Sequence, residues 1–255
     1  MQPHRCRYWL NAKPEDPEGF AEEVKTVCDT YHQALDLYEQ RGHTVSTDEK
    51  TGIQALERMH PTLPMKPGQV ELQEFDYIRH GTQTLIANLE VATGKVIAPT
   101  VGQTRTEEDF AAHIGRTIDL DPDGKWVFIT DQRELAEFVN THQSEALVRL
   151  VAERCGLDQN LGEKGKEGIL QSKQTRAAFL QDSSHRLRFV YTPKHTSWLN
   201  QVECWFSILV RRLLKRASFT SVEELRERIL AFIEFFNKTL AKPFKWTYQG
   251  RPLTV

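Results

Sequence analysis

The sequence predicts an α/β fold in which a mixed sheet carries helices on both of its faces. Two observations support this prediction. Strand-like segments with alternating apolar residues come first, and strands then alternate with amphipathic helical segments. In addition, residues 125–130 form a continuously apolar run, which indicates a strand buried on both faces. The chain has 255 residues, enough for one large domain or two small ones with a sizeable core.

The first predicted element is an N-terminal helix. Residues 1–15 are polar and are typical of a terminal arm or linker. Asp16 is a favourable N-cap and Pro17 suits the first helical position, so the helix should begin there and end at Gly42. Its apolar side should consist of Phe20, Val24, Val27, Tyr31, Leu35 and Tyr38. We therefore assign residues 1–42 to an N-terminal linker and helix.

Several strands are expected next, because short alternating runs are separated by turn-forming residues. A short strand at the start of this region ends in two acids, and proline and glycine then indicate a loop. Three further runs predict an antiparallel meander. These segments are a strand at 43–49, a loop at 60–68, and strands at 70–80, 83–92 and 96–98.

The rest of the chain alternates helices with strands, and Ser or Thr caps indicate several of the helix starts. The expected elements are a helix at 106–118 capped by Thr106, a strand at 125–130 that ends at Asp131, a helix-like segment at 133–139, a helix at 144–154 stopped by Gly156, a loop at 157–171, a helix at 173–181, a strand at 188–191, a helix that follows it, and a last helix begun by a Thr220–Glu223 capping box.

The overall composition excludes some classes of protein. Lysine and arginine total 33 against 35 acids, a net charge of −2, so any surface for nucleic acid must be a local one. The four cysteines are far apart and form no CxxC pair, which argues against a zinc site or a disulfide framework and fits a reducing cytosol. No segment has the features of a signal peptide or a membrane span, so no membrane partner is expected.

The segment at residues 189–216 combines a strand, a proline break and an amphipathic helix. Glu203 falls on the margin of the apolar stripe of that helix, where a carboxylate should be half-buried. It either binds a metal ion or is an acid at the edge of the core that reaches solvent, and the residues alone favour the second interpretation. Trp198 and Trp205 are interpreted as packing residues. The stripe consists of Leu199, Val202, Phe206, Leu209, Val210 and Leu213.

Two predicted strands end in the same way, with threonine followed by Asp48 and by Asp131. If these strands are parallel neighbours, both carboxylates enter one crevice, and the helix that carries Glu203 can bring a third. Oxygen ligands select hard cations such as Mg²⁺ or Mn²⁺. Two such ions about 4 Å apart can activate a water or a 3′-hydroxyl and stabilise the leaving oxygen of a phosphoryl transfer. With 35 acids in the chain, this pattern alone is a weak signal.

Five motifs together carry a resemblance to a known family. The chain resembles the IS630 family of bacterial insertion-sequence transposases, which is related to Tc1/mariner and has an RNase H-like DDE catalytic core. The Thr-Pro-x-His-x-Ser-Trp-Leu-Asn-x-x-Glu signature is specific, and the similarity extends over essentially the whole chain. The motifs are Thr47–Glu57, Thr130-Asp131, Asn140-Thr141-His142, Tyr191–Glu203 and Lys242–Thr247.

The resemblance implies a catalytic triad and a domain. Asp48, Asp131 and Glu203 would be the catalytic residues and would bind Mg²⁺ or Mn²⁺, with two ions expected. The RNase H-like catalytic domain would occupy residues 43–255. It would cut one DNA strand at each transposon end and join the freed 3′-hydroxyl to target DNA. The implied partners are DNA and a second copy of the chain, and the implied location is the bacterial cytoplasm, at the nucleoid.

The resemblance also implies a set of residues around the triad. His195 and Asn200 would line the mouth of the site, and Lys194 would contact phosphates. The same role is expected of the helix cations, for which a solvated helix face is the alternative. Asn140 and His142 are assigned less firmly. The helix cations are Arg211, Arg212, Lys215 and Arg216.

The sequence departs from the family pattern in two places. It contains no convincing helix-turn-helix region for reading transposon ends, and residues 133–139 separate Asp131 from Asn140 and His142 like an insertion. Two alternatives to a transposase therefore stay open. One is a metal-dependent DNA endonuclease without strand transfer, and the other is an inactive or truncated DNA-binding remnant.

Overall fold

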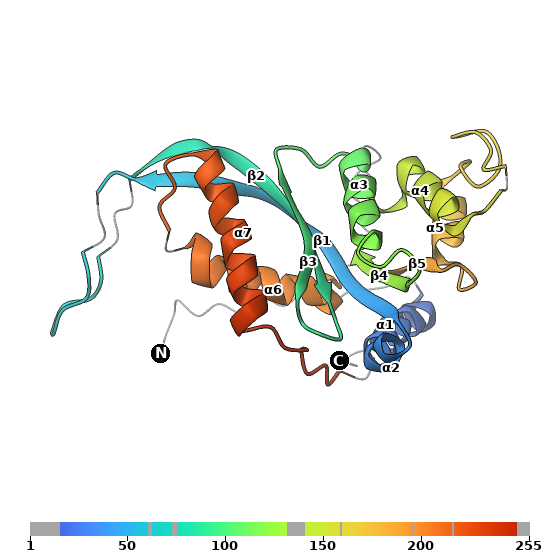
Figure 1. The fold of residues 1–255 in the computed structure, drawn as a ribbon, viewed down its shortest axis with the longest axis horizontal. Coiled ribbons are helices and arrows are strands. Elements are labelled where there is room, and N and C mark those ends of the chain that lie inside the picture. The colour runs from blue at the N-terminus through green and yellow to red at the C-terminus, as the bar shows by residue number, and fades with distance from the viewer. Residues whose placement is uncertain are drawn as a thin grey trace.

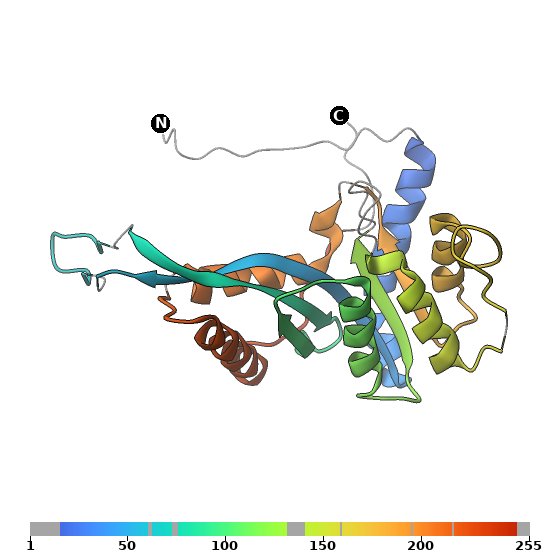
Figure 2. The ribbon, with the colours of Figure 1, turned by 90° about the horizontal axis from the view of Figure 1, so that it is seen from above.

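The structure is a computed structural model that describes residues 16–60, 63–72, 76–131, 141–158, 160–194, 196–215 and 217–248. A mixed sheet runs through it, with helices on both sides (Figures 1 and 2). Its elements are α1 (Pro17–His32), α2 (Ala34–Glu39), β1 (Gly42–Arg58), β2 (Tyr77–Glu90), β3 (Val96–Gly102), α3 (Glu107–Ile118), β4 (Lys125–Asp131), the 3₁₀ turn η1 (Thr141–Gln143), α4 (Glu145–Cys155), α5 (Lys173–Gln181), β5 (Leu187–Thr192), the 3₁₀ turn η2 (Ser197–Leu199), α6 (Gln201–Leu209), the π-helical segment η3 (Val210–Leu214) and α7 (Val222–Thr239).

The sheet has the strand order β3-β2-β1-β4-β5. β1 pairs antiparallel with β2 and parallel with β4, and β4 pairs parallel with β5. Helices α3, α4 and α5 bury their apolar sides against one face of the sheet, and α1, α6 and α7 bury theirs against the other. The predicted α/β class, with a mixed sheet and helices on both faces, is therefore confirmed.

The prediction for the first strands was wrong in length and in connection. β1 continues nine residues beyond the expected end at Glu49, to Arg58, and residues 77–90 of the two predicted strands 70–80 and 83–92 form the single strand β2. A register shift between Lys50 and Ile53, with Gly52 at a φ of +65°, lies where β1 continues past its predicted end. The result is a β1–β2 ribbon that projects beyond the other strands (Figures 1 and 2).

The predicted N-terminal helix is broken at Gln33 into α1 and α2. Asp16 caps α1 by accepting a hydrogen bond from the backbone N–H of Gly19, as predicted. Leu35 and Tyr38, which were expected on the apolar side, lie in α2 and are exposed. Among the described residues, no helix combines the length and the apolarity that a membrane span requires.

The later elements agree closely with the sequence prediction. Helices α3, α4 and α5 and strands β4 and β5 lie within two residues of their expected bounds. The last helix has a different cap: Ser221, not Thr220, accepts the hydrogen bond from the backbone N–H of Glu224. Thr220 instead donates its backbone N–H and its hydroxyl to the Glu224 carboxylate. The helix-like segment predicted at 133–139 lies outside the described residues.

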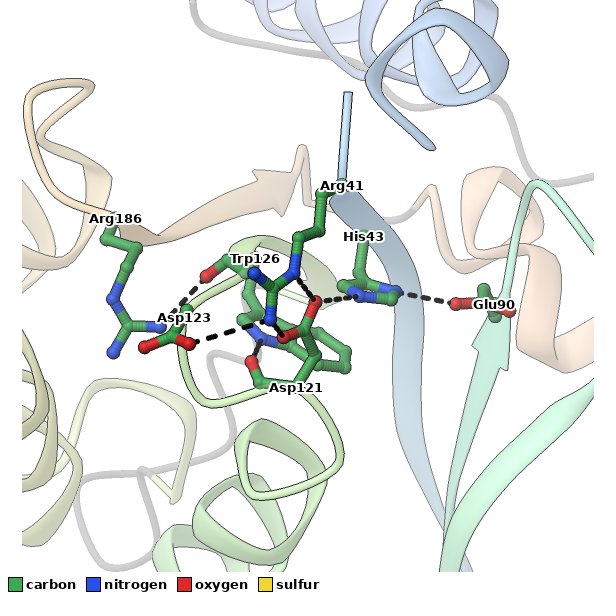
Figure 3. Close-up of polar contacts among 8 residues, drawn as sticks. Arg41, His43, Glu90, Asp121, Asp123, Trp126 and Arg186 are labelled. Atoms are coloured by element: carbon green, nitrogen blue, oxygen red, sulfur yellow. Dashed lines mark hydrogen bonds and ion pairs between the residues drawn. The ribbon is translucent and has the colours of Figure 1, made fainter. Parts of the chain in front are cut away.

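A polar cluster fixes the start of β1 (Figure 3). The imidazole of His43 stacks on Trp126, with ring centroids 4.0 Å apart. Its Nδ1 lies 2.8 Å from Glu90 Oε1 and its Nε2 lies 3.4 Å from Asp121 Oδ2, and Arg41 pairs with the same aspartate at 2.6 Å. The hydrogen bond to Glu90 is the main cause of a raised pKa for His43. The cluster therefore ties β1 to β2 and to the turn before β4 most firmly when the imidazole is charged.

This cluster predicts a pH dependence of stability. A raised pKa in the folded state means that protonated His43 stabilises the fold fully below its unfolded pKa of about 6.5, and that this contribution is lost as the pH rises through the folded pKa. His43→Gln should therefore flatten the decline of the free energy of unfolding between pH 6.5 and 8. Urea denaturation at a series of pH values measures this pH dependence of the free energy of unfolding. His32→Gln, at an exposed position, is the matched control and should keep the slope of the wild type. Equal pH slopes for wild type and His43→Gln would contradict the prediction.

Candidate active site

β1 and β4 run side by side, and each carries one of the predicted site acids. Their parallel register pairs Ser46 with Ile129, and Asp48 and Asp131 each lie two residues further along their strands. Register partners in a parallel pair point to the same face of the sheet. Asp48 is fully buried and Asp131 is 8% exposed. The two strands are thus the parallel neighbours that the sequence interpretation required, and both acids lie on the face that α1 and α6 cover.

Asn200 connects these strands to the start of α6. Its side-chain Nδ2 donates to the backbone oxygen of Thr47 at 3.1 Å and lies 3.4 Å from Asp131 Oδ1, while its Oδ1 accepts from the hydroxyl of Ser46. The hydroxyl of Thr192 also donates to Asp131 Oδ1, at 2.8 Å. These contacts fix the plane of the Asp131 carboxylate. Asn200 is fully buried, so its hydrogen bonds are made without competition from water.

The first turn of α6 is anchored from both sides. Ser46 accepts a hydrogen bond from the backbone N–H of Val202 at 2.8 Å. The hydroxyl of Tyr31 in α1 donates to the backbone oxygen of Leu199 and accepts from the backbone N–H of Gln201. Glu203 lies in this turn, half-buried, three residues after Asn200, so both side chains leave the same side of the helix. The turn that bears Glu203 is therefore fixed to both β1 and α1.

On the opposite face of the sheet, a buried ion pair supports the same strand ends. Glu49 Oε2 lies 3.2 Å from His142 Nε2, and both side chains are 3% exposed. His142 Nδ1 lies 3.0 Å from the Thr130 hydroxyl and donates to the backbone oxygen of Asp131 at 2.9 Å. Burial opposes a charge on this imidazole, but Glu49, Asp48 and the Asp131 carbonyl outweigh it and raise the pKa of His142 to about 8. The imidazolium thus holds β1 and β4 together behind the acidic site.

Asp48, Glu49 and His142 also satisfy the spacing of a metal site, since one potential ligand atom of each lies within 4.8 Å of the others. The imidazole does not suit that role. A carbonyl oxygen can only accept, so Nδ1 must carry a proton, and Nε2 already faces Glu49. A raised pKa further favours the protonated ring, which has no lone pair for a metal. We interpret this cluster as an ion pair.

A family of known sequences matches this arrangement. The family described as DDE superfamily endonuclease matches residues 43–226, which is well over half of the chain and includes all three acids. The chain belongs to this family. For this DDE superfamily member, the sheet order β3-β2-β1-β4-β5 agrees with the predicted fold class, an RNase H-like mixed sheet with helices on both faces. No protein among curated sequences matches it.

Solved structures similar to the DDE endonuclease chain come from the Mos1 mariner transposase. The crystal structure of the Mos1 mariner paired end complex with Mn shares 13% identity and a TM-score of 0.49, over 90% of this chain and 59% of that one. The crystal structure of the Mos1 catalytic domain shares 10% identity and a TM-score of 0.45, over 89% of this chain and 85% of that one. The chain thus spans 59% of the length of the Mos1 chain in the paired end complex.

Other predicted site residues of the DDE endonuclease are more distant or lie outside the described residues. His195 and Asn140 belong to the undescribed part of the chain, as does Arg216. Lys194 is exposed just after β5. Arg211 and Arg212 are exposed on η3, at least eight residues beyond Glu203, or about 12 Å along the helix.

His142 of the DDE endonuclease lies beside the end of β4, in spite of the segment that separates it from Asp131 in sequence, because its imidazole contacts the Asp131 backbone oxygen. The interpretation of the tryptophans was correct for Trp205, which is fully buried. It was wrong for Trp198, which is 53% exposed and touches Tyr248 at its edge.

Sequence reasoning missed several residues that build this site. Tyr31 was read only as part of an apolar helix side, and Ser46 and Thr192 carried no signal beyond their place in a strand. Glu49 was noted only as an acid at a strand end. Alternation gave an indirect clue: Ser46 and Asp48 share one face of β1, so a polar residue two positions before the acid indicates a polar contact on the same face.

Proposed function

We propose that the chain is the catalytic domain of a transposase of the IS630 type. It cuts a DNA strand at a transposon end and joins the freed 3′-hydroxyl to target DNA by metal-assisted phosphoryl transfer, with Asp48, Asp131 and Glu203 as the metal ligands. One observation carries the proposal. Asn200 contacts both β1 and Asp131 and also begins the helix turn that bears Glu203, which supports a shared site for these acids.

The residues present suit a hard divalent cation. All three candidate ligands are carboxylates, the donor type that Mg²⁺ and Mn²⁺ prefer. Asp48 and Asp131 are buried and Glu203 is half-buried, and buried carboxylates stay ionised only with positive charge nearby. Mg²⁺ or Mn²⁺ bound there, with two ions proposed, would supply an activated oxygen nucleophile and a counter-charge for the leaving oxygen.

The chain's own residues position the reacting groups. Thr192 and Asn200 hold Asp131 Oδ1, which orients the other oxygen of this carboxylate. His142 and Glu49 keep the two strand ends in register from behind. We propose that Lys194, Arg211 and Arg212, which are exposed, contact DNA phosphates on either side of the cut. DNA and a second copy of the chain are the proposed partners, and the bacterial nucleoid is the proposed location.

The proposal is tested with end-labelled transposon-end DNA and Mg²⁺ or Mn²⁺. Glu203→Gln should abolish both cleavage and strand transfer, because the neutral amide keeps the shape but loses the charge of a ligand. Glu223→Gln, at an exposed position of α7, is the matched control and should keep wild-type activity.

The products on this DNA separate the alternatives. Strand-transfer products that disappear in Glu203→Gln support a transposase. Cleavage without joining would identify an endonuclease. DNA binding without any cleavage, the same in wild type and variant, would identify an inactive remnant and overturn the proposal.

A further inference from the structure

A cavity of about 210 Å³ lies at the end of the sheet opposite the acidic site. It is lined by Thr44, Lys125 and Arg188, each within the first three residues of β1, β4 or β5, together with His185, Arg186 and the end of α1. Asp131, by contrast, is the last residue of β4. The cavity and the acidic site therefore lie at opposite ends of the same parallel strands.

Three of the residues that line the cavity each have a buried side-chain atom that lacks a hydrogen-bond partner within the described part of the chain. These atoms are the hydroxyl of Thr44, Nδ1 of His185 and Nε of Arg188. Thr44 is 1% exposed and the His185 side chain is 8% exposed, so water does not reach them freely. Buried polar groups are almost always satisfied, and an unsatisfied one costs free energy. Three such atoms around one cavity indicate a ligand that accepts hydrogen bonds.

The charge around the cavity has one sign. Lys125, Arg186 and Arg188 contribute three cations, and none of the described residues that line the cavity is acidic. Arg186 is held rigidly, since it donates to the backbone oxygens of Gly124 and Arg154. Asp182, which is not among the lining residues, has its Oδ2 3.8 Å from His185 Nε2. In a chain with a net charge of −2, this concentration of cations is local.

We propose that this cavity binds a phosphate group. Arginine Nε–H, lysine ammonium, an imidazole N–H and a hydroxyl are all able to donate to phosphate oxygens, and arginine and lysine also balance its charge. The phosphate belongs either to a DNA backbone or to a free phosphate compound. Thr44 shares the face of β1 with Asp48, four residues further on, which is about 13 Å away. The site is independent of the chemistry proposed for the acids.

Binding of inorganic phosphate to the full chain tests the proposal. Phosphate at constant ionic strength should raise the Tm of the wild type saturably and give a single dissociation constant by calorimetry. Arg188→Gln and Thr44→Val should each weaken phosphate binding, Arg188→Gln by about tenfold or more. Thr44→Val replaces only a hydroxyl on a strand, so it guards against a folding defect. Arg226→Gln, which removes one exposed cation from α7, should bind as the wild type does.

Two further experiments identify the source of the phosphate and test whether phosphate binding is independent of the proposed metal ligands. If a short DNA duplex displaces bound phosphate, the natural ligand is a DNA backbone; if phosphate stays bound in the presence of DNA, it is a free phosphate compound. Glu203→Gln should retain phosphate binding even where cleavage is lost. The proposal would be overturned if the wild type showed no saturable phosphate binding. It would also be overturned if Arg188→Gln and Thr44→Val both bound phosphate with the affinity of the wild type.

Discussion

Asp131→Asn is expected to lower the rate of metal-dependent DNA cleavage by about a thousandfold, which corresponds to about 4 kcal/mol of transition-state stabilisation. The amide oxygen of asparagine can still accept from Thr192 and Asn200, so the end of β4 should keep its geometry. What is lost is one negative charge among the proposed metal ligands. The measurement is a single-turnover cleavage rate with Mg²⁺ or Mn²⁺, together with Mn²⁺ affinity by calorimetry.

A matched control distinguishes the loss of cleavage in Asp131→Asn from the effect of removing any negative charge. Asp119 follows α3, where it pairs on the surface with Arg154 at 2.9 Å. Asp119→Asn makes the same chemical change and should leave the cleavage rate within a factor of about two, because exposed ion pairs contribute little. Wild-type cleavage and Mn²⁺ affinity in Asp131→Asn would exclude this aspartate as a ligand.

The second large effect is expected on stability. His142→Leu should lower the free energy of unfolding by about 3 to 5 kcal/mol, because removing one member of a buried ion pair leaves the other charge in a poor environment. The substitution also removes the contacts of the imidazole with the Thr130 hydroxyl and the Asp131 backbone oxygen. Urea denaturation at pH 7 measures the change.

A double-mutant cycle isolates the pair itself. Glu49→Leu combined with His142→Leu removes both charges, so the double variant should be more stable than His142→Leu alone. The coupling is expected only if the 3.2 Å contact between Glu49 and His142 is an ion pair. Additive changes in the free energy of unfolding would show that the two side chains act separately. Lys238→Leu with Glu234→Leu, an exposed pair on α7, serves as the comparison and should show little coupling.

Elements with strong local signals could be predicted from the sequence. The Thr106 cap and the helix stop at Gly156 each depend on a few adjacent residues, and both were predicted and are present. The apolar strand that ends at Asp131 was equally clear. The interpretation of Asp48 and Asp131 required β1 and β4 to be parallel neighbours, which they are, while the shared crevice for the two carboxylates stays a prediction.

What could not be predicted depends on contacts between distant parts of the chain. Glu49 and His142 are 93 residues apart in sequence, and neither carries a pattern that would pair them. The same holds for Tyr31 and the backbone around Leu199. The length of β1 was missed for a related reason: residues 48–52 are polar, and only their pairing with β2 keeps them extended.

The register shift in β1 has a consequence for how related chains can vary in length. Between Lys50 and Ile53, β1 advances three residues while β2 retreats two, so the strand carries one extra residue there. A one-residue insertion or deletion between Gly42 and Asp48 would turn the aspartate to the other face of the sheet and remove it from the site. An insertion or deletion at Thr51 or Gly52 would change the β1–β2 register only from Ile53 onward and would leave Asp48 on its face of the sheet. We therefore expect natural indels in this strand to fall after Lys50 and not before it.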